Sequence, residues 1–402
     1  MRRANIRHRH HCFGVLWVGL LVILAAGCDD RGEVLSAITP AASLPMRIRR
    51  VAAGTEHACA VKDSVLLCWG KNDHGQVGGG AASEWAPRVL VTATEWQDVV
   101  AGGGSSCGLS VGGEVWCWGD NSQGQLGTSD FEKGLAPRKA ALPGPVSSIA
   151  LKFNHACAVL KDESLWCWGE NTEGQLGLGG VFPGAPEPSP REVPSVDGGW
   201  VGVATGQGHT CAIGRTGALW CWGRNTEGEL GSGGIDPGQI RVPNQVGVAT
   251  DWREVAAGQS YSCGIRGAGE LWCWGGDMGQ LGLGLSMQTL SLPTRVTMGT
   301  DFRQLALDTF HTCVQRSTPE GNLWCWGRSI EGQLGVSDPT PRSLPAPFNS
   351  LLTWEAVAVG RFFTCGWQRD AGLFCTGENN SGQLGVGDVE RRSVPTLALA
   401  AP

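Results

Sequence analysis

Cysteine and histidine recur together in this chain, and their spacing allows two kinds of chemistry. A histidine stands two residues before a cysteine at four places, and imidazole and thiolate are ligands that zinc prefers. In an oxidising compartment the same cysteines would form disulfides instead. The four pairs are His57/Cys59, His155/Cys157, His209/Cys211 and His311/Cys313.

Fourteen of the 16 cysteines fall into seven pairs with nearly constant spacing. In five pairs the partners are ten residues apart, with polar turn residues between them. That spacing places the two cysteines opposite each other on adjacent antiparallel strands, where facing Cβ atoms lie about 4.5–5.5 Å apart. The predicted disulfides are Cys59–Cys68, Cys107–Cys117, Cys157–Cys167, Cys211–Cys221, Cys263–Cys273, Cys313–Cys325 and Cys365–Cys375.

Zinc binding is the alternative use of these residues. A zinc site needs about four ligands converging on one ion. Each copy of the pattern offers at most one histidine and two cysteines, and Ser105, Tyr261 and Phe363 replace the histidine in three copies. We therefore predict disulfides, no metal and no cofactor, and we interpret the repeated histidines as structural hydrogen-bonding residues.

Catalytic motifs are missing from the sequence. It has no Gly-x-Ser-x-Gly elbow, no phosphate-binding loop and no two-histidine metal motif. Acids such as Asp162 and Glu163 fall in a predicted turn, where solvated side chains are the rule. We predict that the chain is not an enzyme and that it has no catalytic residue.

The cysteine pairs belong to a longer repeat. The tetrapeptide Gly-Gln-Leu-Gly, or a near copy, occurs seven times at intervals of 49 to 54 residues. A repeat of about 50 residues is typical of propellers and solenoids. The copies begin at Gly75, Gly124, Gly174, Gly228, Gly279, Gly332 and Gly382.

Each copy has the composition of four short strands. A large apolar residue leads the first strand, the paired cysteines lie on the next two, and five copies of the third read Trp-Cys-Trp-Gly. Strands that are apolar on both faces need cover on both sides, which stacked propeller blades provide. The fourth strand is expected to begin with proline, at Pro87, Pro137, Pro194, Pro243, Pro293, Pro345 and Pro395.

These features predict an all-β fold, a seven-bladed β-propeller of four-stranded antiparallel blades over residues 47–399. The last copy ends in a proline-headed strand at Val394–Ala398, whereas no such strand precedes the first copy. We therefore expect this C-terminal strand to complete blade one and so close the ring.

The N-terminus resembles a bacterial lipoprotein signal. Four arginines precede the uncharged apolar stretch Cys12–Gly27, which is short of the about 20 residues that a spanning helix needs. Small residues before Cys28 resemble a lipobox, although Ala25 holds the usual leucine position. Residues 1–27 are then a signal peptide, Cys28 is lipidated, and residues 28–46 are a flexible tether. The alternative is an ordinary cleaved signal with Cys28 as a spectator.

The run Trp168–Gly177, Trp-Gly-Glu-Asn-Thr-Glu-Gly-Gln-Leu-Gly, resembles the regulator of chromosome condensation (RCC1) repeat. The resemblance covers residues 47–399 and implies a propeller. The namesake of the family is a nuclear guanine-nucleotide exchange factor that opens a small GTPase with a protruding wedge. No insertion of that kind stands in this sequence. Other members are secreted bacterial propellers that inhibit β-lactamases by covering the enzyme with one ring face.

The formal net charge of −6 argues against nucleic-acid binding, because such surfaces are basic. We expect a monomeric, extracytoplasmic binding scaffold, anchored by its lipid at the cell envelope, with a protein or cell-envelope partner. The alternatives are inhibition of an envelope hydrolase such as a β-lactamase and, ranked below it, guanine-nucleotide exchange. The predicted partner contacts are apolar side chains in the variable loops, Trp85, Phe131, Phe182 and Met287.

Overall fold

The computed structural model describes residues 48–80, 82–181, 184–235, 239–284, 287–317, 322–348, 353–368 and 370–400. The predicted signal peptide, the lipidation site Cys28, the tether and the contact candidate Phe182 lie outside these residues. Residues 46–402 form one compact unit, to which the description below applies.

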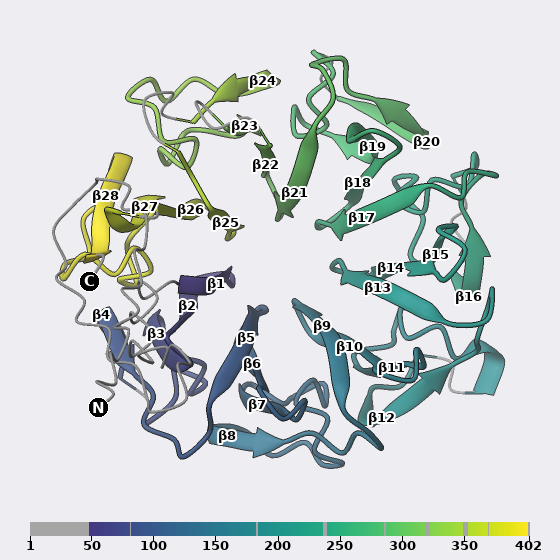
Figure 1. Ribbon diagram of the computed structural model, residues 1–402, viewed down its shortest axis with the longest axis horizontal. Coiled ribbons are helices and arrows are strands. Elements are labelled where there is room, and N and C mark those ends of the chain that lie inside the picture. The colour runs from purple at the N-terminus through teal and green to yellow at the C-terminus, as the bar shows by residue number, and fades with distance from the viewer. Residues whose placement is uncertain are drawn as a thin grey trace, which may run out of the picture. The chain divides into compact units, whose positions relative to one another are not determined.

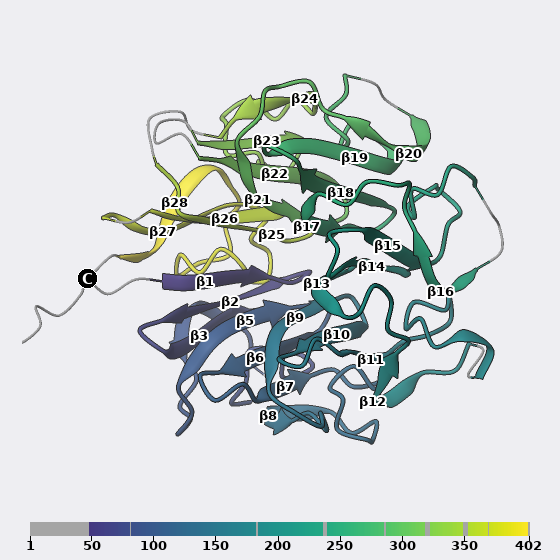
Figure 2. The ribbon, with the colours of Figure 1, turned by 45° about the vertical axis from the view of Figure 1, so that its right-hand side comes forward.

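Seven four-stranded antiparallel sheets are arranged around a central axis (Figure 1). Their strands succeed one another in chain order from the axis outward, and the sheets stack face to face around the ring (Figure 2). Blade one consists of β1 (Ile48–Ala53), β2 (His57–Lys62), β3 (Val65–Gly70) and β4 (Glu84–Val89), and blade two of β5 (Trp96–Ala101), β6 (Ser105–Ser110), β7 (Val115–Gly119) and β8 (Gly134–Lys139). Blade three consists of β9 (Val146–Lys152), β10 (His155–Leu160), β11 (Leu165–Gly169) and β12 (Glu187–Val193), with the short 3₁₀ helix η1 (Gly179–Val181). Blade four consists of β13 (Trp200–Thr205), β14 (His209–Gly214), β15 (Leu219–Gly223) and β16 (Ile240–Gln245).

The remaining three blades repeat this plan. They are β17 (Trp252–Ala257), β18 (Tyr261–Arg266), β19 (Glu270–Asp277) and β20 (Gln288–Arg295); β21 (Phe302–Leu307), β22 (His311–Arg316), β23 (Leu323–Gly327) and β24 (Arg342–Pro347); and β25 (Ala356–Val359), β26 (Phe363–Gln368), β27 (Gly372–Gly377) and β28 (Arg392–Ala400). The predicted seven-bladed, all-β propeller is confirmed.

The predicted manner of closure is wrong. Strand β28 pairs with β27 and completes blade seven, while β4 completes blade one, so each sequence repeat folds into one whole blade. The reason is local: the loop after Gly-Gln-Leu-Gly returns the chain antiparallel to the strand it has just left. No strand of the described residues is exchanged between the first and last blades.

A hydrogen bond from each blade to the preceding repeat joins the ring. The buried second tryptophan of Trp-Cys-Trp-Gly donates its indole N–H to the carbonyl in the Gly-Gln turn of the repeat before it. Trp118 Nε1 thus lies 2.9 Å from Gln76 O. The same bond closes the ring, because Trp69 Nε1 of blade one donates to Gln383 O of repeat seven, also at 2.9 Å. Blade seven has Thr376 instead of this tryptophan, and its hydroxyl donates to Gly332 O.

The apolar core lies between neighbouring blades. At the seam between first and last blades, Leu67 and Trp69 pack with Phe363, Trp367 and other buried residues of blade seven in one cluster. Burying one such large side chain contributes about 1.5–3 kcal/mol. Closure therefore depends on the same packing and the same turn contact as the internal interfaces.

Tight packing explains the glycine that follows each Trp-Cys-Trp. Gly119 has φ +103°, and a Cβ built there would lie 2.4 Å from Gly104 O. Both the positive φ and the close approach of the backbone exclude other residues.

The prolines lie within the outer strands rather than at their heads. Pro87 is the fourth residue of β4, and the residue after it faces Cys68. By the same register the proline of repeat three is Pro190, since Arg191 faces Cys167, and not Pro194 as predicted. Proline is tolerated here because these are edge strands, and it also discourages pairing with other chains.

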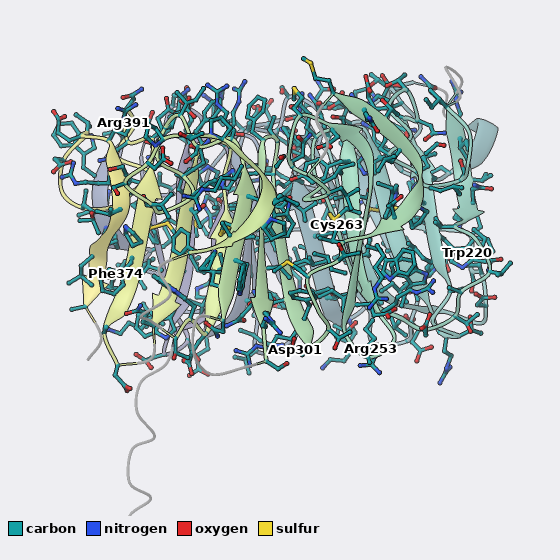
Figure 3. All side chains as sticks on the ribbon, turned by 90° about the horizontal axis from the view of Figure 1, so that it is seen from above. Trp220, Arg253, Cys263, Asp301, Phe374 and Arg391 are labelled. Carbon is teal, nitrogen blue, oxygen red and sulfur yellow. A yellow bond between two sulfur atoms is a disulfide. The ribbon has the colours of Figure 1, made fainter. Side chains whose placement is uncertain are left out.

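The chain enters and leaves every blade on the same side of the ring. We call that side, which also carries the β2–β3 type of hairpin, the hairpin face. The opposite side carries the β1–β2 type of turn and the long loops between third and fourth strands, and we call it the long-loop face. Figure 3 shows Arg391 at the long-loop face and Arg253 and Asp301 at the hairpin face.

All seven predicted cysteine pairs are joined as disulfides across the second and third strands, with Cα atoms 4.1–4.2 Å apart. Each bond lies within a blade. Cys157 and Cys167, for example, are facing residues of β10 and β11.

Replacing both members of one pair, as in Cys157→Ala/Cys167→Ala, should lower the free energy of unfolding by about 2–3 kcal/mol, since a short loop is no longer constrained in the unfolded chain. Urea denaturation measures this loss. Peptide mapping of the unreduced parent should find only linkages within a blade; a linkage between blades would contradict this arrangement.

Candidate functional site

The repeated histidines are buried between blades and are held by hydroxyl groups. His57 Nε2 lies 2.9 Å from Ser106 Oγ of the next blade, and that hydroxyl donates to Gln76 O in the turn of the histidine's own repeat. Because the hydroxyl proton is committed to the carbonyl, the histidine must donate through Nε2–H. The other three contacts are His155–Thr210, His209–Ser262 and His311–Thr364, at 2.8–2.9 Å.

The residue at the histidine position depends on whether the next blade offers a hydroxyl group at the contact. Tyr261 also reaches a hydroxyl, with its OH 3.0 Å from Thr312 Oγ1. The blades that follow Ser105 and Phe363 offer Ala156 and Ala58 instead, and these two positions carry no histidine. The sequence contains this correlation between neighbouring repeats, but reading each repeat separately does not reveal it.

Burial keeps these imidazoles neutral. It lowers the pKa of His57 and His311 to about 4 and the pKa of His155 and His209 to about 3. A group that stays neutral well below pH 6 and already donates its only N–H–bearing nitrogen is poorly suited to proton transfer. The histidines therefore serve the interfaces, as the sequence predicted.

Two deviations from the repeat meet across the ring axis. Most repeats have glycine at the end of the innermost strand, but blades three and six have Lys152 and Asp308. Lys152 Nζ lies 2.7 Å from Asp308 Oδ2, with only 14% and 4% of the two side chains exposed. The ammonium also donates to Leu307 O and Val359 O, so one side chain joins blade three to blades six and seven.

The remaining axial space is a cavity of about 1300 Å³ on the hairpin face. Its lining comes from the innermost strands, the ends of second strands and the hairpin-face turns, and much of it is polar, with Ser148, Glu254, Gln304 and Gln368 among the residues. Wall residue Asn322 donates to Trp354 O at 2.7 Å, and Gln315 donates to the same oxygen. These side-chain amides are thus engaged in holding the segment before β25 and are not arranged as a reactive group.

The structure describes three of the four predicted contact residues, and it does not bring them together. Trp85 is 52% exposed, but it belongs to β4 rather than to a loop, and its indole covers the repeat-seven turn at Gly382. Phe131 is 52% exposed in the long loop of blade two. Met287 is 89% exposed in the long loop of blade five, which lies across the ring axis from blade one.

The predicted contacts left out other exposed apolar side chains of the long-loop face, three of them on blades four to six. Met278 shares the loop of Met287, and Ile235 and Ile330 lie on the loops of the adjacent blades four and six; all three are about half exposed. The signal was present, since each is an apolar residue in a loop of glycine and polar residues. The long loops of blades four to six thus carry four exposed apolar side chains, while Phe131 and Val389 lie on the long loops of blades two and seven.

The described part of the chain offers neither a metal site nor a membrane-spanning helix. Within it, no three histidine, cysteine or acidic side chains gather as a metal site would require. Nor does that part contain a helix with the length and hydrophobicity to cross a membrane.

Comparison with known proteins identifies the family. The model of the RCC1-like domain matches residues 22–314, and the model of the RCC1 repeat matches residues 320–367. The chain belongs to the RCC1-like family. It is 30% identical to the ultraviolet-B receptor UVR8 of Arabidopsis thaliana over 76% of this chain and 70% of that protein. It is 31% identical to human E3 ubiquitin-protein ligase HERC2 over 75% of this chain, but only 5% of that protein.

Solved structures share the RCC1-like fold. Prp20p of Saccharomyces cerevisiae superposes with a TM-score of 0.73 at 20% identity, covering 89% of this chain and 86% of that one. Human WBSCR16 gives 0.71 at 21% identity, covering 81% and 91%. Prp20p was studied for its binding to Gsp1p and histones. At these identities the likeness concerns the fold alone.

Removing the axial lysine should destabilise the ring. Lys152→Met leaves the buried Asp308 carboxylate without its cation and should cost about 3–5 kcal/mol in the free energy of unfolding. Adding Asp308→Asn removes that charge while the amide oxygen can still accept from Thr309. The double variant should therefore be more stable than Lys152→Met alone by about 2 kcal/mol. Urea denaturation measures the unfolding free energy of the two variants. Equal values would contradict a buried ion pair.

The histidines should make stability depend on pH. Their pKa is lower in the folded chain than the ordinary 6.5. Between about pH 6.5 and 4 the unfolded chain therefore binds protons that the folded chain does not, and stability falls as pH falls. Each histidine contributes up to about 1.4 kcal/mol per pH unit.

The variant His155→Phe/Thr210→Ala copies the natural pair Phe363/Ala58 and tests this dependence. Its unfolding free energy, measured by urea denaturation from pH 7 to 4, should fall less steeply with falling pH than that of the parent. The difference between the two slopes should equal the contribution of one histidine. Identical slopes would show that His155 titrates normally in the folded protein.

Proposed function

We propose that this RCC1-like propeller is a non-catalytic binding scaffold that holds a protein or cell-envelope partner on its long-loop face. The proposal rests on the observation that the repeated polar groups are occupied in hydrogen bonds between blades. The buried histidines, the interface hydroxyls and the turn carbonyls are engaged with one another between blades. The repeats differ from one another mainly in the long loops, where apolar side chains are exposed on a rigid scaffold.

Blades four to six supply the strongest candidate contact. Met278 and Met287 are on one loop, whose ends are held together by a 2.8 Å bond from Met287 N to Asp277 O. Ile235 and Ile330 flank them on the neighbouring blades. Methionine and other large apolar side chains are enriched at protein–protein interfaces. When such side chains are exposed on a protein without a partner, they lower its solubility. A partner would bury these four side chains together.

We also propose that the chain is exported and attached to the envelope through Cys28. The charged N-terminus, the apolar stretch and the small residues before Cys28 support export and lipidation. The disulfides described above suit an oxidising compartment.

Affinity capture tests the contact. The purified chain should recover a partner from an envelope extract of the cells that produce it. Met278→Ser/Met287→Ser should reduce recovery about tenfold, because losing about 1.4 kcal/mol of apolar contact has that effect. Val91→Ser/Val111→Ser is the matched control, since both valines are exposed on the hairpin face. Its recovery should equal that of the parent.

The same experiment separates the other functions. Capture of one hydrolase whose activity falls when the chain is added would favour an inhibitor. Capture of a GTPase that then releases guanine nucleotide would favour an exchange factor. Loss of recovery in the valine control, with full recovery in the methionine variant, would contradict a contact on the long-loop face.

A further inference from the structure

The long loop of blade five exposes two methionines. Met278 directly follows β19 and Met287 directly precedes β20 (Figure 1). Met278 is 58% exposed and Met287 is 89% exposed. Both thioethers are therefore open to reagents in solution.

The position of Met278 is polar in every other repeat. The residue before the turn glycine is histidine, glutamine, glutamate or serine in the other six copies, namely His74, Gln123, Glu173, Glu227, Glu331 and Ser381. A polar side chain is the ordinary choice at an exposed turn position, because an apolar one gains its stability from burial. The blade itself therefore does not require a methionine here.

The position of Met287 suits glycine better than methionine. Its φ is +59°, in the left-handed region, where glycine is tolerated and a side chain is disfavoured. The bond from Met287 N to Asp277 O holds the backbone at this point. A side chain that is exposed and also disfavoured by its backbone contributes little to folding, which points to a use outside the fold.

The other sulfur atoms of the described residues are shielded. All fourteen cysteines among them are joined in disulfides and are at most 1% exposed. Met298, the third described methionine, packs against the apolar cluster of blades five and six. An oxidant that meets the folded chain therefore reaches the sulfur atoms of Met278 and Met287 first.

We propose that Met278 and Met287 form a reversible oxidation site, at which a peroxide converts both thioethers to sulfoxides and makes this part of the long-loop face polar. The sulfur lone pair forms the S–O bond and the peroxide O–O bond breaks. The departing hydroxide takes the proton of the transferred hydroxyl and becomes water. Each sulfur loses two electrons to the peroxide, and methionine sulfoxide reductases reverse the change with electrons from thiols.

Oxidation would weaken the partner contact proposed above, and this consequence rests on that proposal. A sulfoxide oxygen accepts hydrogen bonds, so burying it against an apolar partner surface without a donor is unfavourable. Oxidation of both side chains should therefore reduce recovery of the partner about tenfold, as Met278→Ser/Met287→Ser does. A bound partner would in turn cover both sulfur atoms and slow their oxidation.

Peroxide treatment of the intact chain, followed by peptide mass spectrometry, tests the site itself. Hydrogen peroxide should add one oxygen atom to Met278 and to Met287 several times faster than to Met298. The unfolding free energy in urea should remain that of the untreated chain, because both side chains are exposed. Equal rates at the three methionines would overturn the proposal.

Hydrophobic-interaction chromatography measures the change of the surface without a partner. The oxidised chain should elute earlier than the untreated chain. Met278→Leu/Met287→Leu has neither thioether and should elute at the same position before and after treatment. The matched control Met298→Leu should shift as the parent does. An unshifted parent, or an equal shift in Met278→Leu/Met287→Leu, would overturn the proposal.

Affinity capture compares each protein before and after treatment. Recovery by the parent and by Met298→Leu should fall about tenfold and should return after incubation with a methionine sulfoxide reductase and dithiothreitol. Recovery by Met278→Leu/Met287→Leu, whatever its starting level, should not change on treatment. A fall in that variant would assign the effect to another residue and overturn the proposal.

The oxidation site and the scaffold function can fail separately. If the parent shifts in chromatography through Met278 and Met287 but recovers no partner in either state, the scaffold proposal falls and the oxidation site stands. If the parent recovers the same amount of partner before and after complete oxidation, the scaffold proposal stands and this one falls.

Discussion

One backbone carbonyl per repeat organises the propeller. In six of the seven interfaces the carbonyl in the turn of one repeat accepts the indole N–H of the next blade. Four of these carbonyls also accept a hydroxyl from that blade. In the seventh interface Gln333 O accepts the hydroxyl of Thr364 alone. A buried carbonyl must be paired. This requirement explains why the turn is retained around the ring, while the positive φ of its glycines, as at Gly75 (φ +86°), disfavours other residues there. Where tryptophan is missing, in blade seven, threonine hydroxyls replace it.

Charged deviations from the repeat come in compensating pairs. Repeat four has Glu229 in place of the turn glutamine, and Arg224 lies 2.7 Å from it. Burial raises the pKa of Glu229, although the guanidinium opposes that shift. Lys152 and Asp308 compensate each other in the same way across the axis. Both cases follow from the cost of leaving a charge alone in a closely packed interface.

The fold was predictable because the repeat is strong and local. Five copies of Trp-Cys-Trp-Gly and seven cysteine pairs of nearly constant spacing specify hairpins with a defined register, and apolar residues on both faces demand stacked sheets. The manner of closure was not predictable from the phase of the repeat, because it depends on which strand the long loop returns to. Pro194 was misassigned for a related reason: repeat three has several prolines in this stretch, Pro190 and Pro194 among them, and only strand register distinguishes them.

The functional surface was less predictable. Apolar residues in loops are visible in the sequence, and Met287 and Phe131 are indeed exposed. Trp85 looked the same but covers a neighbouring turn, a contact between residues almost 300 positions apart. The axial ion pair likewise depends on which repeats face each other across the axis. Comparing each repeat with its successor, position by position, would have recovered the histidine–hydroxyl rule.

The seam between blades seven and one has a consequence for how the polypeptide can be reordered. Ile48 and Ala400 both lie on the hairpin face, and the contact that joins them is of the same kind as the internal ones. The ring therefore has no privileged opening point. A circular permutant that joins these ends and starts in another hairpin-face connection, such as residues 140–145, would retain every blade and every disulfide, since none spans such a connection.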